Sequence, residues 1–427
     1  MKIENQIRKI TGLIKKGLLH VFIGNLSSKI FRFLSSIFVA RLVDKSQYGA
    51  WSYAYNIYSL ILLFDGLGIA SGVIQYCAKE KDEKKSLLIL NFGKRFGGYV
   101  NLVISFITFM TAFFAPLKIP SARFYLVGIS FVPPIRIIYT VTIQYIRARK
   151  KAQMYGYVTS FNAAIYLIVV LLTTPFIDIW GLVIAEYLVI MFSLLILARQ
   201  IPKLEHFERI VNSLDHSMKT EIIKYSFVAN LSNVMSQLLY LIDTFLVGQI
   251  LGKADILASY KVGTLIPYNL NFIPLALMTF FYPYFASKSD DRMWVRKKAG
   301  ELVKTLMIIN AIISISVILF ANYITYFLFG SKYSDSVIIL RILMIGYFFA
   351  ATFRIPFGNL IASLGEVRIN LINSIISGLS NIVLDVFLIL KYGVIGAAMV
   401  TVLVFVLSSM ISVYAFLKLT KPETIDR

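Results

Sequence analysis

Long stretches of apolar residues follow one another along almost the whole 427-residue chain, separated by short polar segments. Most approach the roughly 20 residues that an α-helix needs to cross a bilayer. They are continuously apolar rather than alternating, so the pattern predicts an all-α polytopic membrane protein and disfavours a β-barrel. We expect about 12 transmembrane helices, at residues 18–40, 49–76, 97–117, 122–146, 157–177, 180–198, 223–250, 256–286, 303–328, 336–363, 368–390 and 394–417. Pro133-Pro134 is expected to kink the fourth of them.

The polar segments divide these expected helices into two groups of six. The longest interruption, residues 199–222, is predicted to be a cytoplasmic linker between an N-terminal lobe (1–198) and a C-terminal lobe (223–427). Isoleucines recur at helical spacing among basic residues in 1–16, which predicts an amphipathic helix on an anionic membrane surface. Histidine and cysteine are scarce and show no metal-ligand spacing, so we expect neither a metal nor another cofactor.

Charge gives the chain an orientation. The sequence has a formal net charge of +21 and a mean hydropathy of +0.75. Most Lys and Arg residues fall in alternate polar segments, and the positive-inside rule then places both termini in the cytoplasm. This topological asymmetry accounts for most of the net charge, so no nucleic-acid partner is implied.

The first expected helix carries an unusual polar stripe. Lys29 and Arg32 lie within it, and a cation at the bilayer centre costs about 2.5–3.5 kcal/mol on insertion scales. Asn25 and Ser36 continue the stripe at helical spacing, so all four side chains share one face. Intramembrane charges typically face a bundle interior or an aqueous cavity. The stripe therefore predicts a site for an anion.

A second stripe matches the first. Moving Asn25 by 208 positions, from 25 to 233, overlays the first expected helix on the seventh. The four stripe positions then fall on neutral residues, namely Asn233, Gln237, Tyr240 and Thr244. Both halves begin inside, so this is a parallel repeat, and substrate sites in such transporters tend to lie where the repeats meet. We expect a cleft lined by the first, second, seventh and eighth helices.

Further polar residues lie within the apolar stretches. Arg136, in the fourth, is predicted to line a cavity, because burial without a partner is costly. Arg354, in the tenth, either lines the cavity or snorkels toward the cytoplasmic face. The eleventh carries polar side chains at helical spacing, for which we predict interhelical hydrogen bonds: Asn370, Asn373, Ser377 and Asn381.

Three aspartates are candidates for energy coupling or for structural pairing: Asp65, Asp243 and Asp385. Asp65 is closest to mid-membrane. It either pairs with Lys29 or Arg32, or exchanges a proton during transport. Asp65 and Asp243 are our coupling candidates.

Short motifs along the whole chain resemble one family. The run from Arg41 to Ser52 (RLVDKSQYGAWS) is similar to the loop after the first helix in bacterial polysaccharide transporters of the O-antigen flippase type. The motifs DGLGIA from Asp65, the segment from Asp243 to Tyr260, and YGVIGAA from Tyr392 are similar to other parts of that family. This sequence has Val43-Asp44 where many members have Leu-Gly. The family lies within the multidrug/oligosaccharidyl-lipid/polysaccharide exporter superfamily.

The resemblance implies a flippase of the bacterial cytoplasmic (inner) membrane, with two six-helix lobes around a central cavity that opens alternately to each side. The implied cargo is an oligosaccharide on undecaprenyl pyrophosphate, moved to the external leaflet for O-antigen, capsule or another surface polysaccharide. Membrane lipids, a polysaccharide polymerase and a chain-length regulator are the implied partners. The cations expected at the phosphate are Lys29, Arg32, Arg136 and Arg354. The neutral groups expected at the sugar or cavity are Asn25, Ser36, Asn56, Asn233, Gln237 and Tyr240.

Two other classes are alternatives to a flippase. A multidrug exporter of the same superfamily would carry cations and need an acidic cavity, whereas the mid-membrane excess here is basic. A membrane-embedded polysaccharide polymerase usually shows a sizeable external loop or an acidic catalytic cluster, and the sequence has neither. It also lacks a phosphate-binding loop of the Gly-x-x-x-x-Gly-Lys type. We therefore predict a transporter, not an enzyme, that does not use ATP directly.

Overall fold

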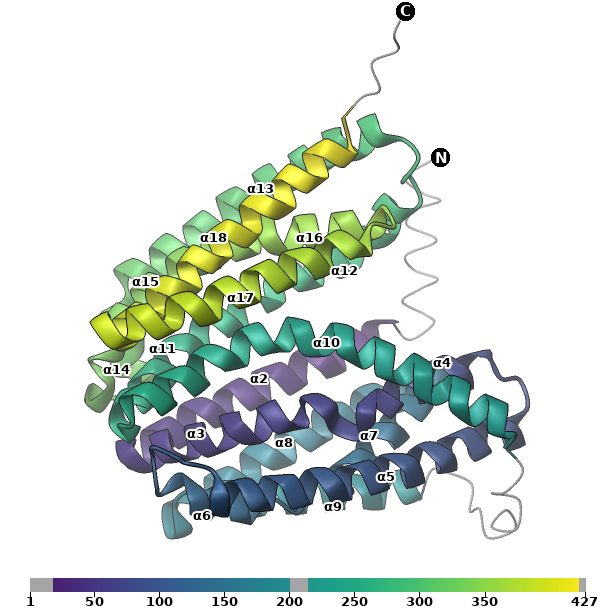
Figure 1. Ribbon diagram of the computed structural model, residues 1–427, viewed down its shortest axis with the longest axis horizontal. Coiled ribbons are helices and arrows are strands. Elements are labelled where there is room, and N and C mark those ends of the chain that lie inside the picture. Colours follow the sequence, from purple (N-terminus) through teal and green to yellow (C-terminus); the bar gives the residue numbers. More distant parts are fainter. Residues whose placement is uncertain (1–17, 200–213, 422–427) are drawn as a thin grey trace, which may run out of the picture. The chain divides into compact units, whose positions relative to one another are not determined.

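The computed structural model describes residues 18–199 and 214–421, and these ranges consist of helices and short connections without a β-strand (Figure 1). The predicted all-α fold class is confirmed. The predicted amphipathic segment 1–16 and most of the predicted linker lie outside the described residues.

The chain forms two compact units. The first comprises residues up to Asp44 together with Ala54–Val234, and the second comprises Lys45–Tyr53 together with the residues from Met235 on. The first unit contains α2 (Leu18–Leu42), η1 (Leu62–Gly68), α4 (Ile69–Lys79), α5 (Glu83–Phe114), α6 (Ala122–Ile129), α7 (Val132–Ala148), α8 (Ala152–Ile177) and α9 (Trp180–Ala198). The second contains α11 (Ala254–Leu270), α12 (Phe272–Ala286), α13 (Arg292–Leu319), α14 (Ala321–Phe329), η4 (Ser331–Tyr333), α15 (Ser336–Phe349), η5 (Ala350–Arg354), α16 (Ile355–Ser363), α17 (Val367–Tyr392) and α18 (Val394–Leu419).

Two helices belong partly to each unit. The helix α3 (Lys45–Ile61) passes from the second unit into the first after Tyr53, and α10 (His216–Leu251) passes from the first into the second after Val234. Within the second unit, Gly49 of α3 lies directly against α11, where an added Cβ would come within 1.8 Å of the Ala254 carbonyl oxygen. The start of α3 is therefore built into the second unit. The division into lobes 1–198 and 223–427 stays a prediction.

Every predicted span contains a helix, although not every helix is strongly apolar. Among the described residues, nine helices are long and apolar enough to cross a membrane, and ten are if the bent pair α6 and α7 counts as one span. The two predicted spans outside this set are α2 and α10, which carry the polar stripes. The exact number of twelve stays a prediction.

The fourth span bends where the sequence predicts a kink. Helices α6 and α7 meet at 49°. Pro133 lies in the first turn of α7, where the missing N–H of proline costs no helical hydrogen bond. The predicted kink is therefore confirmed, and it lies at the start of α7.

The second span is interrupted rather than continuous. Between α3 and α4, the residues from Phe64 to Leu67 leave helical geometry, with φ of 54° at Gly66 and 48° at Leu67. Asn101 of α5 is fully buried, makes two hydrogen bonds to this break and ties it to α7 through a third. It accepts from Gly66 N at 2.7 Å and donates to Asp65 Oδ1 at 2.7 Å and to Pro133 O at 2.8 Å. Backbone groups freed inside a membrane must find such partners.

Each unit has its own apolar core. In the first unit, buried residues of α4, α5, α7 and α8 pack together, including Ile69 and Val141. In the second, buried residues of α12, α13, α16 and α18 do the same, including Leu360 and Phe416. The polar side chains of each unit, described below, are therefore positioned by helices that pack around that unit's own core.

Helices α2 and α8 approach so closely that only glycine fits between them (Figure 1). A Cβ on Gly156 would lie 2.3 Å from the His20 carbonyl oxygen, which cannot move without moving α2.

We expect Gly156→Ala to destabilise the protein by about 2 kcal/mol through overpacking. The check is the melting temperature of the purified protein in detergent. Gly98→Ala is the matched control, because a Cβ at this helical glycine would meet no atom within 4 Å. Equal melting temperatures for the two variants would contradict the argument.

Candidate functional site

The polar stripe of α2 faces α8 within the first unit. Tyr155 OH donates to Asn25 Oδ1 at 3.2 Å, so the first stripe residue has a partner in α8. Ser36 Oγ donates to the Arg32 carbonyl oxygen one turn earlier, at 3.0 Å. Lys29 is exposed. The stripe is thus partly a helix–helix contact and partly an accessible cationic surface.

Arg32 is the best-anchored cation of the stripe. Its Nη2 donates to Asn162 Oδ1 at 3.1 Å, and its Cζ lies 4.0 Å from the centre of the Tyr166 ring. Its Nη1 lies 3.7 Å from Oε1 of Glu186, a buried residue of α9. The Arg32 side chain nevertheless stays 40% exposed. We call Arg32, Asn162, Tyr166 and Glu186 the arginine centre.

A second ion-pair environment surrounds Arg136 of α7. Asp65 and Glu186 both act on it electrostatically, together with Tyr55 and Tyr58 of α3. Asp65 receives a hydrogen bond from Asn101, and its two predicted roles, pairing with Lys29 or Arg32 and proton exchange, stay predictions. Arg32 and Arg136 lie near two carboxylates, those of Asp65 and Glu186. When exposed Lys29 of the same stripe is added, the formal charges of these five side chains sum to +1.

The second unit has a cation of its own, Arg354. It ends the π-helical turn η5, a type of irregularity that is frequent at functional sites. Its Nη1 donates to Tyr240 OH at 2.9 Å, its Nε donates to Ser408 Oγ at 3.2 Å, and its Cζ lies 5.2 Å from the centre of the Phe405 ring. Tyr240 in turn stacks edge-on against Tyr268. Two predicted site residues, Arg354 and Tyr240, are therefore brought together, and the two alternatives for Arg354, cavity lining and snorkelling, stay predictions.

Two carboxyl groups meet in the second unit. Asp243 of α10 and Asp385 of α17 interact directly, and both are essentially inaccessible. Thr401 Oγ1 donates to Asp243 Oδ2 at 2.6 Å, while neither oxygen of Asp385 finds a donor among the described residues. Two adjacent buried carboxylates cannot both stay charged, so this acidic pair must share a proton or hold a cation.

The other predicted site residues are not gathered into these centres. Asn56 is buried in α3. Asn233 and Gln237 are exposed on α10. In α17, the predicted interhelical role is confirmed for two residues. Asn373 donates to Ser408 O at 3.0 Å and to Ser412 Oγ at 2.9 Å in α18, and Asn370 donates to Gly358 O at 2.8 Å in α16. Ser377 instead donates to Asn373 Oδ1 within α17.

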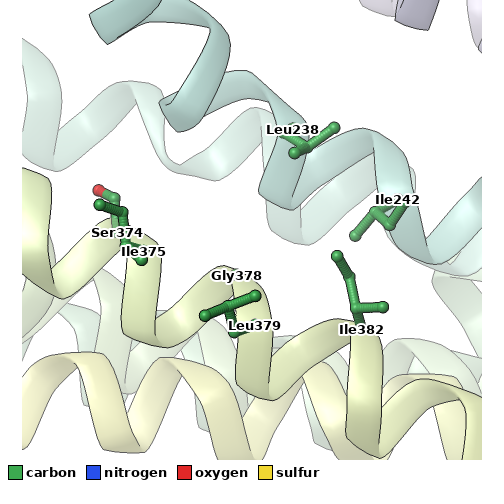
Figure 2. A pocket seen from close by; sticks show the side chains of 7 residues that line it. All are labelled: Leu238, Ile242, Ser374, Ile375, Gly378, Leu379 and Ile382. Atoms are coloured by element: carbon green, nitrogen blue, oxygen red, sulfur yellow. The ribbon is translucent and has the colours of Figure 1, made fainter.

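An apolar groove lies between α10 and α17 of the second unit (Figure 2). Its volume is about 110 Å³. Apart from Ser374, its lining is hydrocarbon or glycine: Leu238, Ile242, Ile375, Gly378, Leu379 and Ile382. A groove of this size and lining has room for a short segment of a hydrocarbon chain.

The most important residue that sequence reasoning missed is Glu186. It is the only ionisable carboxylate among the 19 residues of α9. A lone acid in such a stretch is itself a signal for an intramembrane partner. Asn162 and Asn101 were missed for a different reason, since a single asparagine in an apolar helix shows nothing about what it contacts. In the part of the chain that the structure describes, no group of three or more His, Cys, Asp or Glu side chains could hold a metal ion.

The chain matches a family of polysaccharide biosynthesis proteins over residues 38–338. Among curated proteins, it is 30% identical over 168 residues to a protein of Shigella flexneri named "Putative O-antigen transporter". That match covers 39% of this chain and 40% of the relative, so the chain aligns with about two fifths of the relative's length.

Two solved structures show the fold more completely. The lipid II flippase MurJ, in an inward closed conformation, aligns with 94% of this chain and 89% of its own, with a TM-score of 0.70 and 17% identity. An inward-facing multidrug resistance transporter of the MATE family in the MOP superfamily aligns with 93% of this chain and 96% of its own, with a TM-score of 0.71 and 13% identity. At these identities the likeness shows the fold alone.

Proposed function

Because this chain belongs to the polysaccharide biosynthesis protein family, we propose that it is a flippase for an oligosaccharide linked to undecaprenyl pyrophosphate. The cargo would pass from the cytoplasmic to the external leaflet by alternating access between the two predicted lobes. The product would serve O-antigen, capsule or another surface polysaccharide. No covalent step is part of this proposal.

The observation that carries the proposal is the arginine centre. Arg32 is half-exposed, yet its guanidinium is held by the neutral groups Asn162 and Tyr166. A planar guanidinium fixed in this way suits a phosphate, to which it can donate two parallel hydrogen bonds. Lys29 lies one turn away on the same helix and would add a second, more mobile charge.

The remaining site assignments are part of the same proposal. Arg136 and Arg354 would complete the anion-binding cations of the two lobes. The sugars would contact neutral side chains, for which our candidates are Asn25, Ser36, Asn56, Asn233, Gln237 and Tyr240. The apolar groove between α10 and α17 offers room for part of the polyprenyl chain.

Energy coupling is assigned to the acidic pair. Asp65 was the first coupling candidate because of its depth, but its hydrogen bond to Asn101 favours a structural role. Asp243 fits better, since it shares a buried site with Asp385 that must bind a proton or a cation. Binding on one side of the membrane and release on the other would then drive the cycle.

The proposed location is the bacterial cytoplasmic membrane, with both termini in the cytoplasm. The charge asymmetry of the sequence supports this orientation. A polysaccharide polymerase and a chain-length regulator are the proposed protein partners, because they would act on the exported product.

A multidrug exporter is the second candidate, and the MATE neighbour favours it at the level of fold. Its cationic substrates would need accessible acids. Asp243 and Asp385 of the second unit are buried as a pair, and Glu186 of the first unit is buried beside Arg32. The charge pattern therefore supports an anionic cargo.

Vesicles containing the purified protein provide the test of function. We expect them to flip a fluorescent undecaprenyl-pyrophosphate-linked oligosaccharide at least tenfold faster than protein-free vesicles, and not to take up a cationic dye faster than those vesicles. The physical reason is the excess of cations in the first unit. Quenching of external fluorescence measures the first rate, and dye uptake measures the second. Transport of the dye without the glycolipid would replace the flippase proposal by the exporter.

A further inference from the structure

Glu186 compensates the charge of Arg32 without fixing its position. Its Oε1 lies 3.7 Å from Arg32 Nη1, which is longer than the roughly 2.7–2.9 Å of a charge-assisted hydrogen bond. In the described part of the chain, this Oε1 accepts no hydrogen bond although it is buried. The pairing is therefore electrostatic and loose.

Arg32 owes its position to other groups. Asn162 accepts from its Nη2 and is itself tied to α9, because Asn162 Nδ2 donates to Ser193 Oγ at 3.0 Å. The Tyr166 ring lies against the guanidinium from the same face of α8. Both anchors are neutral, and the close α2–α8 contact at Gly156 keeps the helices together. Removing the negative charge of Glu186 therefore leaves Arg32 in place.

The Arg32 guanidinium is held by neutral groups and is only loosely paired with the buried carboxylate of Glu186. Another anion can therefore take the place of that carboxylate without displacing Arg32. A guanidinium has five N–H donors, and one of those of Arg32 is used by Asn162. The exposed part of the side chain leaves room for an incoming anion. We propose that Glu186 is the internal counter-ion that the cargo's pyrophosphate replaces on Arg32, and that it returns to Arg32 when the cargo leaves.

This inference rests on the proposed function and adds a positioning residue to it. Glu186 repels the bound pyrophosphate and so weakens its binding. The same repulsion speeds release on the far side, after which the ion pair re-forms and the empty protein carries less net charge. A transporter needs both steps, because cargo that binds too tightly cannot leave.

The experiment compares Glu186→Gln with the wild-type protein in nanodiscs of uncharged phospholipid, with undecaprenyl pyrophosphate as the probe. We expect the dissociation constant to fall about tenfold, because a like charge next to the ligand is gone. We expect the flipping rate in vesicles to fall at the same time, since release becomes slow. A purely structural role for Glu186 would loosen Arg32 and weaken binding instead.

Glu301→Gln is the matched control. It removes an equal charge from an ion pair with Lys298 on α13, and both partners are exposed. Affinity and flipping should stay at wild-type values. Glu186→Asp is the second variant, in case the glutamine variant does not fold. It moves the carboxylate away from Arg32, so binding should tighten by a smaller factor.

The outcomes separate the two proposals. If the wild-type protein binds undecaprenyl pyrophosphate but both Glu186 variants bind it equally well or more weakly, the counter-ion inference is overturned and the flippase proposal stands. If the wild-type protein neither binds the probe nor flips the glycolipid, both are overturned.

Discussion

The double variant Arg32→Gln, Glu186→Gln is expected to reach the membrane as a folded protein and to flip glycolipid at least about 100-fold more slowly than the wild type. Loss of the charge-assisted contact of Arg32 with a phosphate weakens binding, because the point charge of Lys29 cannot replace a planar guanidinium that donates two parallel hydrogen bonds. The pair is substituted together for a structural reason. Arg32→Gln alone would leave Glu186 buried without its cation, at a cost of about 3–5 kcal/mol. The double variant removes both charges and avoids that penalty.

Two measurements make this result interpretable. The protein level in the membrane and the melting temperature of the purified variant establish folding, and vesicle flipping establishes function. The control is Lys298→Gln, Glu301→Gln, which removes an exposed ion pair of the same net charge. It should flip at the wild-type rate. A folded Arg32→Gln, Glu186→Gln variant that keeps more than half the wild-type rate would show that the arginine centre does not hold the cargo.

Asp385→Asn is expected to raise the free energy of unfolding and to make flipping independent of an ion gradient. Neither oxygen of Asp385 has a donor among the described residues, and Asp243 lies directly beside it. An amide has the same shape as the carboxyl group, carries no charge that Asp243 could repel, and can donate a hydrogen bond to Asp243. We therefore expect a gain of about 1 kcal/mol in unfolding free energy. The same change removes the group that takes up a proton or cation. Flipping should therefore no longer respond to an imposed gradient.

The measurement uses vesicles with a pH gradient in one arm and a sodium gradient in the other. Whichever gradient accelerates the wild-type protein should have no effect on Asp385→Asn. The exposed Asp290 supplies the control, since Asp290→Asn removes a carboxylate outside the pair and should keep both stability and coupling. Unchanged gradient dependence in Asp385→Asn would remove the acidic pair from the cycle.

The helices were predictable because the bilayer imposes one rule on every span. An apolar stretch of sufficient length must form its own backbone hydrogen bonds, so each of the predicted spans contains a helix. The kink at Pro133 was predictable for the same local reason. The break after Leu62 was not predicted, because a motif such as DGLG permits irregular backbone but does not require it. Asn101, far away on α5, is what stabilises it.

The candidate site was predictable in its charges and not in its pairings. Lys29 and Arg32 stand out because a cation in an apolar helix needs a partner, and the structure supplies Glu186 for Arg32. Helical spacing places residues on a face but does not say which helix that face meets. Asn25 and Arg32 both bond to α8, a pairing that the repeat did not predict, and the cleft predicted between the repeats stays a prediction. Arg354 and Tyr240 are 114 residues apart, and no local pattern joins them.

The first nine residues of α3 have a consequence for biogenesis. Lys45 Nζ pairs with both oxygens of Asp335, 290 residues further along the chain, and Gly49 packs against Ala254. A nascent chain leaves the ribosome N-terminus first. The start of α3 therefore enters the membrane before Ala254 and Asp335 have been synthesised. Until then Lys45 cannot form its ion pair with Asp335. Consider two fragments made by dividing the chain between residues 199 and 222. They should assemble only when both are expressed in the same cell, and the N-terminal fragment expressed alone should be sensitive to proteolysis.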